Sequence, residues 1–570
     1  MKRLCGYKVL ILVLLAASAI VAGFNTIDTG KIHIGFATSS ERFPRDAVPA
    51  VALSSQWKAT AWKGEMVHQQ ILVWSDAGLP ALRIKKINAL KNGSGHTIEA
   101  RHVQAGFVGY VITDEYGDKV SSCKNDRRGQ QFDSSWVADP IYSQLQMAAQ
   151  RHKVQPIWIS VAVPATAVQG TYTGSIEIEA DKKTILPITI EVLDRTLPPP
   201  AQWSFHLDLW QHPAAIARVA KLPLWSNAHF DAMRPYYTML ARAGQKVITT
   251  SIIHEPWDHQ TYDDFPSMVR WIKKRDGSWQ YDFSLFDKYV QFVMDCGIDQ
   301  QINCYSMIPW KLSFTYFDEA LGIDTILTAQ PGTEAYTQFW KPMLTHFAAH
   351  LKKKGWFNKT TIAMDERPMK SMQTVIALLK SVDKDWKITL AGNYHPEIEK
   401  DIYDYSVASQ FQFDSVSLKE RKATGKKSTF YTCCAEPYPN GFTYSPPDEH
   451  VWIGWYVAAN GFDGYLRWAF NSWPEEPMQD SRFELGPAGD TYQIYPGALS
   501  SIRFEKLIEG IQDFEKINML KKEYKATNNK QALNKLEQAL QAFQINKLKT
   551  ETAASMVERV KPLLNVSKSF

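Results

Sequence analysis

The stretch Thr361-Ile-Ala-Met-Asp-Glu366, followed by Arg367-Pro368, joins a short apolar run to two adjacent carboxylates. The run is typical of a buried strand, and burying two unpaired carboxylates within it would be costly. Successive strand side chains face opposite ways, so Asp365 and Glu366 can serve one site only where the strand leaves its sheet. In a parallel α/β barrel that place is the C-terminal rim, where active sites are built. The alternative is a solvated helix start, with Asp365 as the cap of a helix beginning near Pro368.

Eight short apolar runs follow residue 201, and helix-like stretches separate most of them. The runs are 203–209, 247–253, 301–307, 361–366, 387–392, 406–410, 429–434 and 464–470. Amphipathic stretches lie between them at 230–243, 283–294, 334–351, 369–382 and 449–460. Strand followed by helix, repeated over about 300 residues, predicts a (β/α)₈ TIM-like barrel over residues 201–500.

The chain on either side of this region shows other patterns. From 24 to 197, short β-branched runs between turn signals predict an N-terminal antiparallel β-sandwich. Its last two runs, 171–179 and 183–192, largely alternate apolar and polar residues around a polar turn, which predicts a hairpin. Pro187 in the second run suggests that this strand lies at a sheet edge. Apolar positions at helical spacing predict a helical C-terminal extension over 501–570.

The N-terminal residues 1–23 have the layout of a secretory signal peptide. Lys2, Arg3 and Lys8 precede an apolar run that ends in small residues. This run is short for a membrane span. We therefore expect an exported protein, periplasmic or extracellular, with no membrane span in the mature chain.

Composition and cysteine spacing exclude several classes of protein. The 570 residues carry a net charge of +5 that is dispersed along the chain, so nucleic-acid binding is not expected. The five cysteines beyond the signal peptide show no repeating spacing, so we expect no disulfide framework and interpret Cys433-Cys434 as core thiols. No motif with metal-ligand spacing is present, so we expect neither a metal nor a cofactor. Nothing in the sequence indicates the oligomeric state.

If the eight runs are barrel strands, their C-terminal ends converge on one mouth. Carboxylates, aromatic rings and amides collect there, as in sugar sites, where rings stack and amides fix hydroxyl groups. Packing at the rim is the alternative for any one of these side chains. The candidate substrate-binding residues are Trp210, His254, Tyr305, Asn393, Tyr394, Tyr431, Glu436, Trp468, Asn471 and Trp473.

Four segments carry a resemblance to a known family. They are Gly464-Tyr-Leu-Arg-Trp-Ala-Phe-Asn-Ser-Trp473, Pro487-Ala-Gly-Asp-Thr-Tyr492, Tyr495-Pro-Gly497 and Ser501-Ile-Arg-Phe-Glu-Lys-Leu-Ile-Glu-Gly-Ile-Gln-Asp-Phe-Glu515. Together they resemble the catalytic domain of glycoside hydrolase family 123. The resemblance covers nearly the whole mature chain. It implies an exo-acting β-N-acetylgalactosaminidase with an adjacent Asp-Glu pair, which falls here on Asp365 and Glu366.

A 2-acetamido sugar carries its own nucleophile, the amide oxygen, and such a retaining, substrate-assisted reaction needs two carboxyl groups. Asp365 would stabilise the amide as it gains positive charge, and Glu366 would be the general acid/base. One alternative is a retaining glycosidase with Glu366 as acid/base and Glu436 as nucleophile, although no Asn precedes Glu366 as is usual in such enzymes. A second alternative is a non-catalytic carbohydrate-binding protein.

Overall fold

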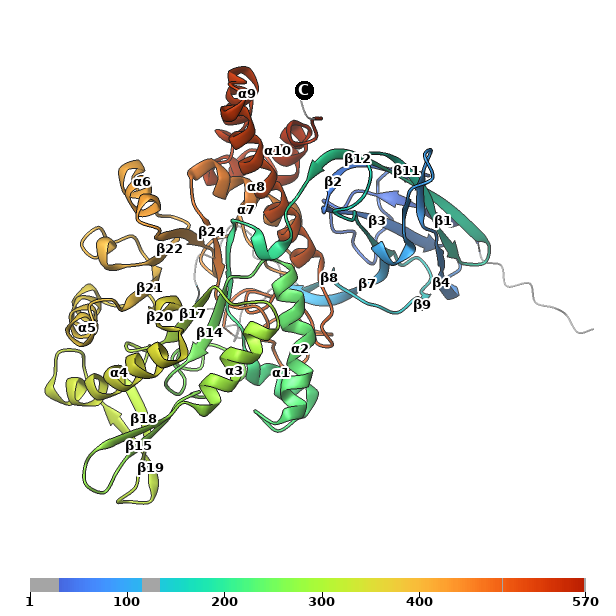
Figure 1. The fold of residues 1–570 in the computed structure, drawn as a ribbon. Helices are drawn as coiled ribbons and strands as arrows, with labels where there is room; N and C mark the ends of the chain where they lie inside the picture. The colour runs from blue at the N-terminus through green and yellow to red at the C-terminus, as the bar shows by residue number, and fades with distance from the viewer. Residues whose placement is uncertain (1–29, 115–122, 124–133, 484, 568–570) are drawn as a thin grey trace, which may run out of the picture.

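The computed structural model describes residues 30–114, 123, 134–483 and 485–567, so the predicted signal peptide at 1–23 lies outside the described residues. Figure 1 shows N-terminal sheets, a central barrel with its helices, and C-terminal helices between the two. Within the described ranges, no helix has the length and apolar character needed to cross a membrane.

Eight parallel strands form the barrel in the order β13-β24-β23-β22-β21-β20-β17-β14. They are β13 (His206–Leu209), β14 (Val247–Ser251), β17 (Gln301–Tyr305), β20 (Thr360–Met364), β21 (Lys387–Gly392), β22 (Asp404–Ala408), β23 (Lys427–Tyr431) and β24 (Gly464–Arg467). Each strand overlaps one predicted run, which confirms the barrel. Most are buried along their whole length, as expected for strands covered on both faces.

Glutamine side chains help to close the barrel between β13 and β14. The backbone N–H of Leu209 donates to Gln245 Oε1 at 3.0 Å, and the N–H of Thr249 donates to Gln211 Oε1 at 2.9 Å. A direct backbone bond, from Lys246 N–H to the Leu207 carbonyl at 3.0 Å, joins β13 to the residue before β14. The side-chain amides thus satisfy backbone groups that a continuous ladder would otherwise pair.

Seven helices lie between the barrel strands. They are α1 (Pro213–Ala220), α2 (Asn227–Arg242), α3 (Ser284–Asp295), α4 (Glu334–Lys354), α5 (Met369–Val382), α6 (Ser415–Ala423) and α7 (Asp448–Asn460). The described connection from β21 to β22 contains a short 3-10 turn, Glu399–Asp401, in place of an α-helix. The barrel is therefore (β/α)₈-like with one helix missing from its outer layer.

The helix α8 (Ile502–Ala526) follows the eighth strand and packs along α7. A Cβ added to Gly454 of α7 would lie 1.9 Å from the carbonyl oxygen of Gly510, so this crossing requires glycine. Two further helices, α9 (Lys530–Leu540) and α10 (Ala553–Val560), contact α7 or α8. The predicted C-terminal extension thus begins with a helix that belongs to the barrel's outer layer.

A small four-stranded sheet, which the sequence analysis missed, is inserted after β14 and β17. Its order is β16-β15-β18-β19, from β15 (Arg270–Lys273), β16 (Trp279–Asp282), β18 (Ser313–Asp318) and β19 (Ile323–Thr328). Trp271 of this sheet stacks on Phe339 of α4, with ring centroids 4.4 Å apart. The contact fixes the inserted sheet beside the barrel (Figure 1).

The N-terminal domain is a mainly antiparallel sandwich whose two sheets share one buried core. One sheet contains β1 (Ile32–Ala37), β3 (Met66–Ser75), β10 (Gln155–Ala162), β7 (Val103–Asp114) and β8 (Ser134–Ile141). The other contains β2 (Trp57–Lys63), β12 (Lys183–Thr196), β11 (Gly170–Glu179), β4 (Leu79–Ile87) and β9 (Gln146–Ala149), with the short β5 (Leu90–Asn92) and β6 (Thr97–Ile98) beside them.

The predicted hairpin is confirmed as β11 and β12, but the prediction that its second strand lies at a sheet edge is wrong. The strand β12 is interior because it also pairs with β2, in parallel, from Ile188 onward. Pro187 immediately precedes this pairing. The missing N–H of proline is therefore tolerated without an edge position.

Buried ion pairs attach the sandwich to the barrel. Asp139 of β8 accepts bonds from Arg42 at 3.0 Å, Arg503 at 2.9 Å and the Tyr495 hydroxyl at 2.7 Å. Removing one partner from such a group leaves an uncompensated buried charge, which is strongly destabilising. The end of β8 is thereby fixed against the start of α8.

Candidate active site

A cavity of ≈ 380 Å³ opens at the C-terminal end of the barrel strands. Ala363, Ala391 and Ala408 stand at or next to the last residues of β20, β21 and β22 and belong to the buried cluster around it. Their small side chains leave space at this end of the barrel. The larger groups around that space are Trp210, Trp257, Trp310, Asp365, Glu366, Tyr431 and Trp468.

Asp365 is the first residue after β20 and is only 9% exposed. The indole N–H of Trp257 donates to its Oδ2 at 2.8 Å. Burial, together with the nearby charge of Glu366, raises the pKa of Asp365 to about 7, although the Trp257 bond and the charge of Arg367 act in the opposite direction. A positive charge forming beside this carboxyl group would favour its anionic form.

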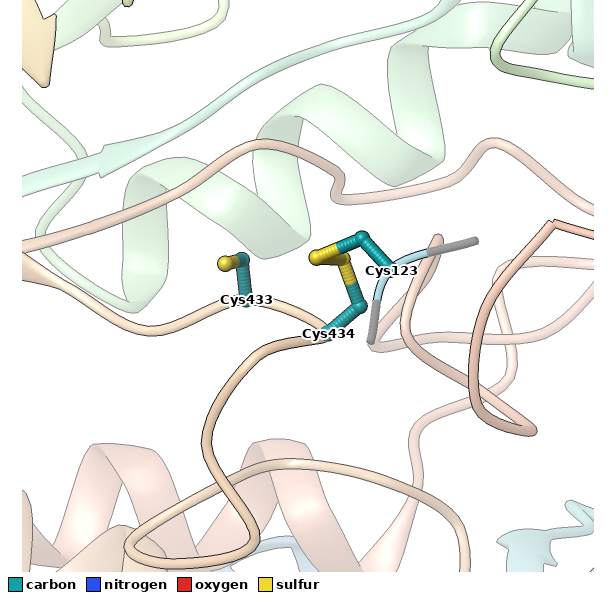
Figure 2. A group of neighbouring side chains, drawn as sticks. All are labelled: Cys123, Cys433 and Cys434. Atoms are coloured by element: carbon teal, nitrogen blue, oxygen red, sulfur yellow. A yellow bond between two sulfur atoms is a disulfide. The ribbon is translucent and has the colours of Figure 1, made fainter. Parts of the chain in front are cut away.

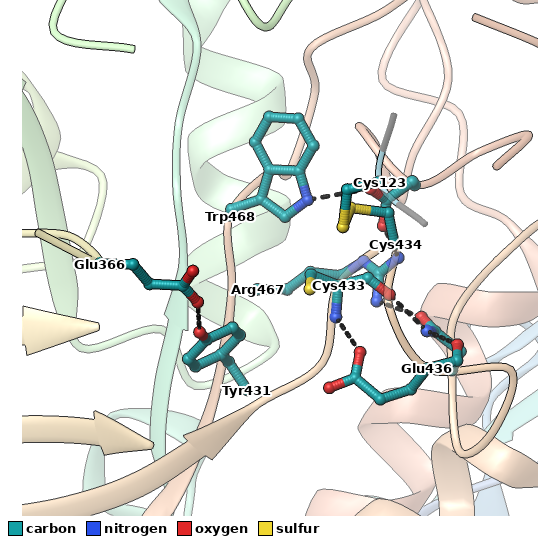
Figure 3. The surroundings of a disulfide bond; sticks show 10 residues. Cys123, Glu366, Tyr431, Cys433, Cys434, Glu436, Arg467 and Trp468 are labelled. Atoms are coloured by element: carbon teal, nitrogen blue, oxygen red, sulfur yellow. Dashed lines mark hydrogen bonds and ion pairs between the residues drawn. A yellow bond between two sulfur atoms is a disulfide. The ribbon is translucent and has the colours of Figure 1, made fainter. Parts of the chain in front are cut away.

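Glu366 is exposed at the opening of the same cavity. The hydroxyl of the buried Tyr431, the last residue of β23, donates to Glu366 Oε1 (Figure 3). The two adjacent carboxyl groups therefore lie in different environments, one buried against indole and one open to an incoming molecule. Such a difference is how neighbouring carboxyl groups acquire separate acid and base roles.

Packed aromatic rings form the floor of the cavity. The ring centroids of Trp210 and Trp257 lie 5.2 Å apart, and Tyr305 lies 4.6 Å from the first and 4.9 Å from the second. Tyr305 is fully buried and supports the two indoles instead of lining the cavity itself. The indole surfaces suit the apolar faces of sugar rings.

Two predicted rim residues are used in packing. The side-chain amide of Asn471 accepts from the His212 N–H at 2.9 Å and donates to the His212 carbonyl at 2.8 Å. The fully buried Trp473 donates its indole N–H to the carbonyl of Ile494 at 2.6 Å. Both side chains connect β24 to neighbouring segments and lie outside the cavity lining.

Three further predicted residues do not line the cavity either. His254 is exposed to solvent beyond β14. The backbone carbonyl of Asn393 accepts the Tyr405 hydroxyl at 2.6 Å. The ring of Tyr394 packs on Phe413 with centroids 5.2 Å apart.

Glu436 also lies outside the cavity lining, although it follows β23 as predicted. Its Oε1 accepts the hydroxyl of Ser409, and its Oε2 accepts the backbone N–H of Cys433 at 2.9 Å. Figure 3 shows this carboxylate bonded to the Cys433 backbone and separate from the Glu366–Tyr431 pair. Glu436 thus holds the loop that follows β23.

Four further residues line the cavity although they were not among the candidates from the sequence: Trp257, Gln260, Trp310 and Leu485. Trp310 is 39% exposed and follows β17 by five residues. Its place after a barrel strand was a usable signal. Gln260 and Leu485 lie in long connections, where sequence position does not indicate side-chain direction.

Three cysteines form one wall of the cavity (Figure 2). Cys123 and Cys434 are joined by a disulfide across 311 residues of sequence, while Cys433 is a half-buried free thiol. The interpretation of Cys434 as a core thiol is therefore wrong. Its partner lies in a distant connection of the sandwich, which spacing along the sequence cannot reveal.

Two clusters among the described residues have ligand atoms within 4.8 Å of one another: the three cysteines, and Glu255 with His259 and Asp264. Two of the three sulfur atoms are already bonded to each other. Glu255 uses its carboxylate oxygens to accept the N–H groups of His259 and Phe265 at 3.2 and 2.8 Å. Hydrogen bonding within the loop thus accounts for the second cluster.

Opening the disulfide should weaken substrate binding more than it slows the chemical step. The Cys123→Ser variant loses part of the cavity wall, whereas Asp365 and Glu366 keep their positions. We expect KM to rise about fivefold, equivalent to about 1 kcal/mol, with kcat little changed. Steady-state kinetics on this variant, and on the wild type after reduction, would measure it. Cys296→Ser, at a half-buried free thiol outside the cavity lining, is the control, and a fall in kcat with unchanged KM would contradict the placement of the disulfide in the substrate-binding wall.

A parallel barrel whose mouth presents two carboxyl groups in contrasting environments, among four tryptophans, is the arrangement of a glycosidase. The model "Glycoside hydrolase 123, catalytic domain" matches residues 210–520, and "Glycoside hydrolase 123 N-terminal domain" matches residues 36–180. The chain belongs to glycoside hydrolase family 123.

One solved structure agrees with this assignment. A family 123 glycoside hydrolase from Clostridium perfringens, studied for glycolipid glycan hydrolysis, is 27% identical with a TM-score of 0.81, and the match covers 89% of this chain and 91% of that chain. A family 39 glycoside hydrolase from Bacteroides cellulosilyticus WH2 has 10% identity and a TM-score of 0.34 over 80% and 82% of the two chains, a likeness too weak to carry an argument. No curated protein sequence matches the chain.

Proposed function

We propose that the protein is an exo-acting β-N-acetylgalactosaminidase that releases terminal β-linked N-acetylgalactosamine from glycans by a retaining, substrate-assisted mechanism. The observation that carries this proposal is the contrast between buried Asp365 and exposed Glu366 at one cavity. The C. perfringens relative, with its link to glycolipid glycans, supports a glycan substrate.

The proposed reaction has two steps, and both carboxyl groups take part in it. The acetamido oxygen attacks the anomeric carbon while Glu366 gives its proton to the departing glycosidic oxygen. The Asp365 carboxylate accepts the amide N–H and stabilises the positive charge of the cyclic intermediate. Water then attacks the anomeric carbon on the face that the leaving group vacated, and Glu366 takes the proton of this water. The bond from the anomeric carbon to the acetamido oxygen breaks, which opens the ring of the cyclic intermediate. Two inversions at one carbon give overall retention.

The alternative with Glu436 as nucleophile has less support. Both of its oxygens accept hydrogen bonds from Ser409 and Cys433, and its side chain lies outside the cavity lining. A binding protein without catalysis would not need a carboxyl group as deeply buried as Asp365, because that burial is costly.

We also propose that the protein is exported, as its N-terminal sequence indicates. The Cys123–Cys434 disulfide supports this proposal because such bonds persist mainly in oxidising compartments.

The purified protein should release nitrophenol from a β-linked N-acetylgalactosaminide without added metal. A panel of nitrophenyl acetamido-sugars and plain hexosides, followed by absorbance, would test this. Turnover of the gluco but not the galacto acetamido-sugar would show that the enzyme is specific for N-acetylglucosamine. No turnover across the panel would contradict the proposal. A chelator should have no effect. Activity lost to a chelator and restored by a metal would contradict the two-carboxyl mechanism.

A further inference from the structure

A second cavity of ≈ 370 Å³ adjoins the catalytic one, and Trp310 lines both. Its other walls come from the connection between β17 and β18, from β18 and β19 of the inserted sheet, and from the first turn of α5. Its volume is within the range of sites for small ligands. A sugar attached to the one in the catalytic cavity could therefore reach it past Trp310.

The charge of this second cavity is positive. Lys311 and Arg367 are among its lining residues, and none of the described lining residues is a carboxylate. Four further lining side chains offer hydroxyl or amide groups: Ser313, Thr328, Gln330 and Ser371. Cations among hydrogen-bonding groups match a ligand that is both hydroxylated and anionic.

Both cations have hydrogen-bonding capacity to spare. The Arg367 guanidinium lies over the Trp310 ring at 5.0 Å from its centroid and donates to the Trp310 carbonyl at 3.3 Å, while its buried Nε has no partner. The exposed Lys311 ammonium has no hydrogen-bond or ion-pair partner among the described residues. Pro368, the N-cap residue of α5, provides no side-chain cap, so the N–H groups of this helix start add positive potential.

We propose that this cavity binds an anionic group on the sugar next to the residue released, either the carboxylate of a hexuronate or a sulfate ester. The assignment of the released residue rests on the proposed function. Trp310 separates the two sugar positions, and Arg367 and Lys311 pair with the anion. The protein therefore prefers acidic glycans over neutral ones of the same linkage.

Matched disaccharides test this inference. Each has a terminal β-linked N-acetylgalactosamine joined to a neutral hexose, to the corresponding hexuronate, or to the sulfated hexose. For the wild type we expect a higher kcat/KM on one or both acidic substrates, and a preference that declines with added salt. Preference for the hexuronate alone identifies a carboxylate site, and preference for the sulfated sugar alone identifies a sulfate site. Equal rates on all three would overturn the inference.

Substitution of the exposed cation gives a sharper comparison. Lys311→Gln should lower kcat/KM on the preferred acidic substrate roughly fivefold and leave the neutral substrate and the nitrophenyl glycoside unchanged. The control is Lys353→Gln, an exposed lysine at the far end of α4, which leads to the opposite end of the barrel. An equal loss on acidic and neutral substrates would overturn the inference.

A binding measurement separates this inference from the proposed function. Calorimetric titration of the acidic and neutral disaccharides into Glu366→Gln should show tighter binding of the acidic one, and the added Lys311→Gln change should remove the difference. This result supports the anion site even if no substrate is hydrolysed. Equal affinities, together with normal release of nitrophenol by the wild type, would overturn the anion site alone.

Discussion

Glu366→Gln should lower kcat/KM by roughly 10²–10⁴-fold for substrates with sugar or alkyl leaving groups, and much less for nitrophenyl substrates. Only a poor leaving group needs a proton as the glycosidic bond breaks. Glutamine has a similar size and cannot supply that proton, and because Glu366 is exposed the fold should be retained. A series of aryl glycosides with graded leaving groups would show kcat/KM of the variant depending far more steeply on the leaving group than that of the wild type.

Tyr431→Phe is the matched control for this experiment. It removes the hydroxyl that bonds Glu366 Oε1 but leaves the carboxyl group in place. Its loss of activity should be smaller and less dependent on the leaving group. If Glu366→Gln lost the same factor on good and poor leaving groups, Glu366 would not be the general acid.

The barrel could be predicted because its strands are covered on both faces. Such strands appear as short apolar runs, and all eight were located to within three residues at each end. The inserted sheet was missed because its strands are short and partly exposed, although Asp276-Gly277 between β15 and β16 is a hairpin signal. The apolar spacing of α8 predicted a helix, but that spacing is the same whether the helix covers the barrel or extends from it.

The sequence predicted those lining residues whose place follows from the end of a barrel strand. Asp365, Glu366, Trp210, Tyr431 and Trp468 line the cavity because each lies at the carboxyl end of a barrel strand or directly after it. The direction of a side chain in a connection depends on contacts distant in sequence. The side chain of Asn471 is hydrogen-bonded to the backbone of His212, and Cys434 forms a disulfide with Cys123. No local pattern shows such partners.

Asp365→Asn should lower kcat by roughly 10²–10³-fold on an acetamido-sugar, whatever its leaving group, which corresponds to about 3 kcal/mol or more of lost electrostatic stabilisation. The new side chain keeps an oxygen to accept the Trp257 indole N–H, so local packing should persist. What it loses is the anion that faces the charged cyclic intermediate. Steady-state kinetics with a nitrophenyl substrate, for which protonation matters least, would isolate this loss from that of Glu366→Gln.

The pH dependence provides a second measure of the same group. Burial raises the pKa of Asp365 to about 7, so the free enzyme loses the needed anion as the pH falls through that value. Wild-type kcat/KM should therefore decline below about pH 7, and Asp365→Asn should lack this decline while retaining any change on the alkaline side. A variant profile that still fell below pH 7 would assign the titration to another group.

Two further measurements distinguish the substrate-assisted reaction from a covalent one. A thiazoline that mimics the cyclic intermediate should inhibit the wild type strongly and Asp365→Asn weakly, because only the wild type presents an anion to the charged ring. Glu436→Gln should cost far less than Asp365→Asn, since Glu436 holds the loop at Cys433 and does not line the cavity. Two results would show that the acetamido group is not the nucleophile: a sugar trapped on Glu436, or full activity on a sugar with a plain 2-hydroxyl group. Asp365 would then only position other groups.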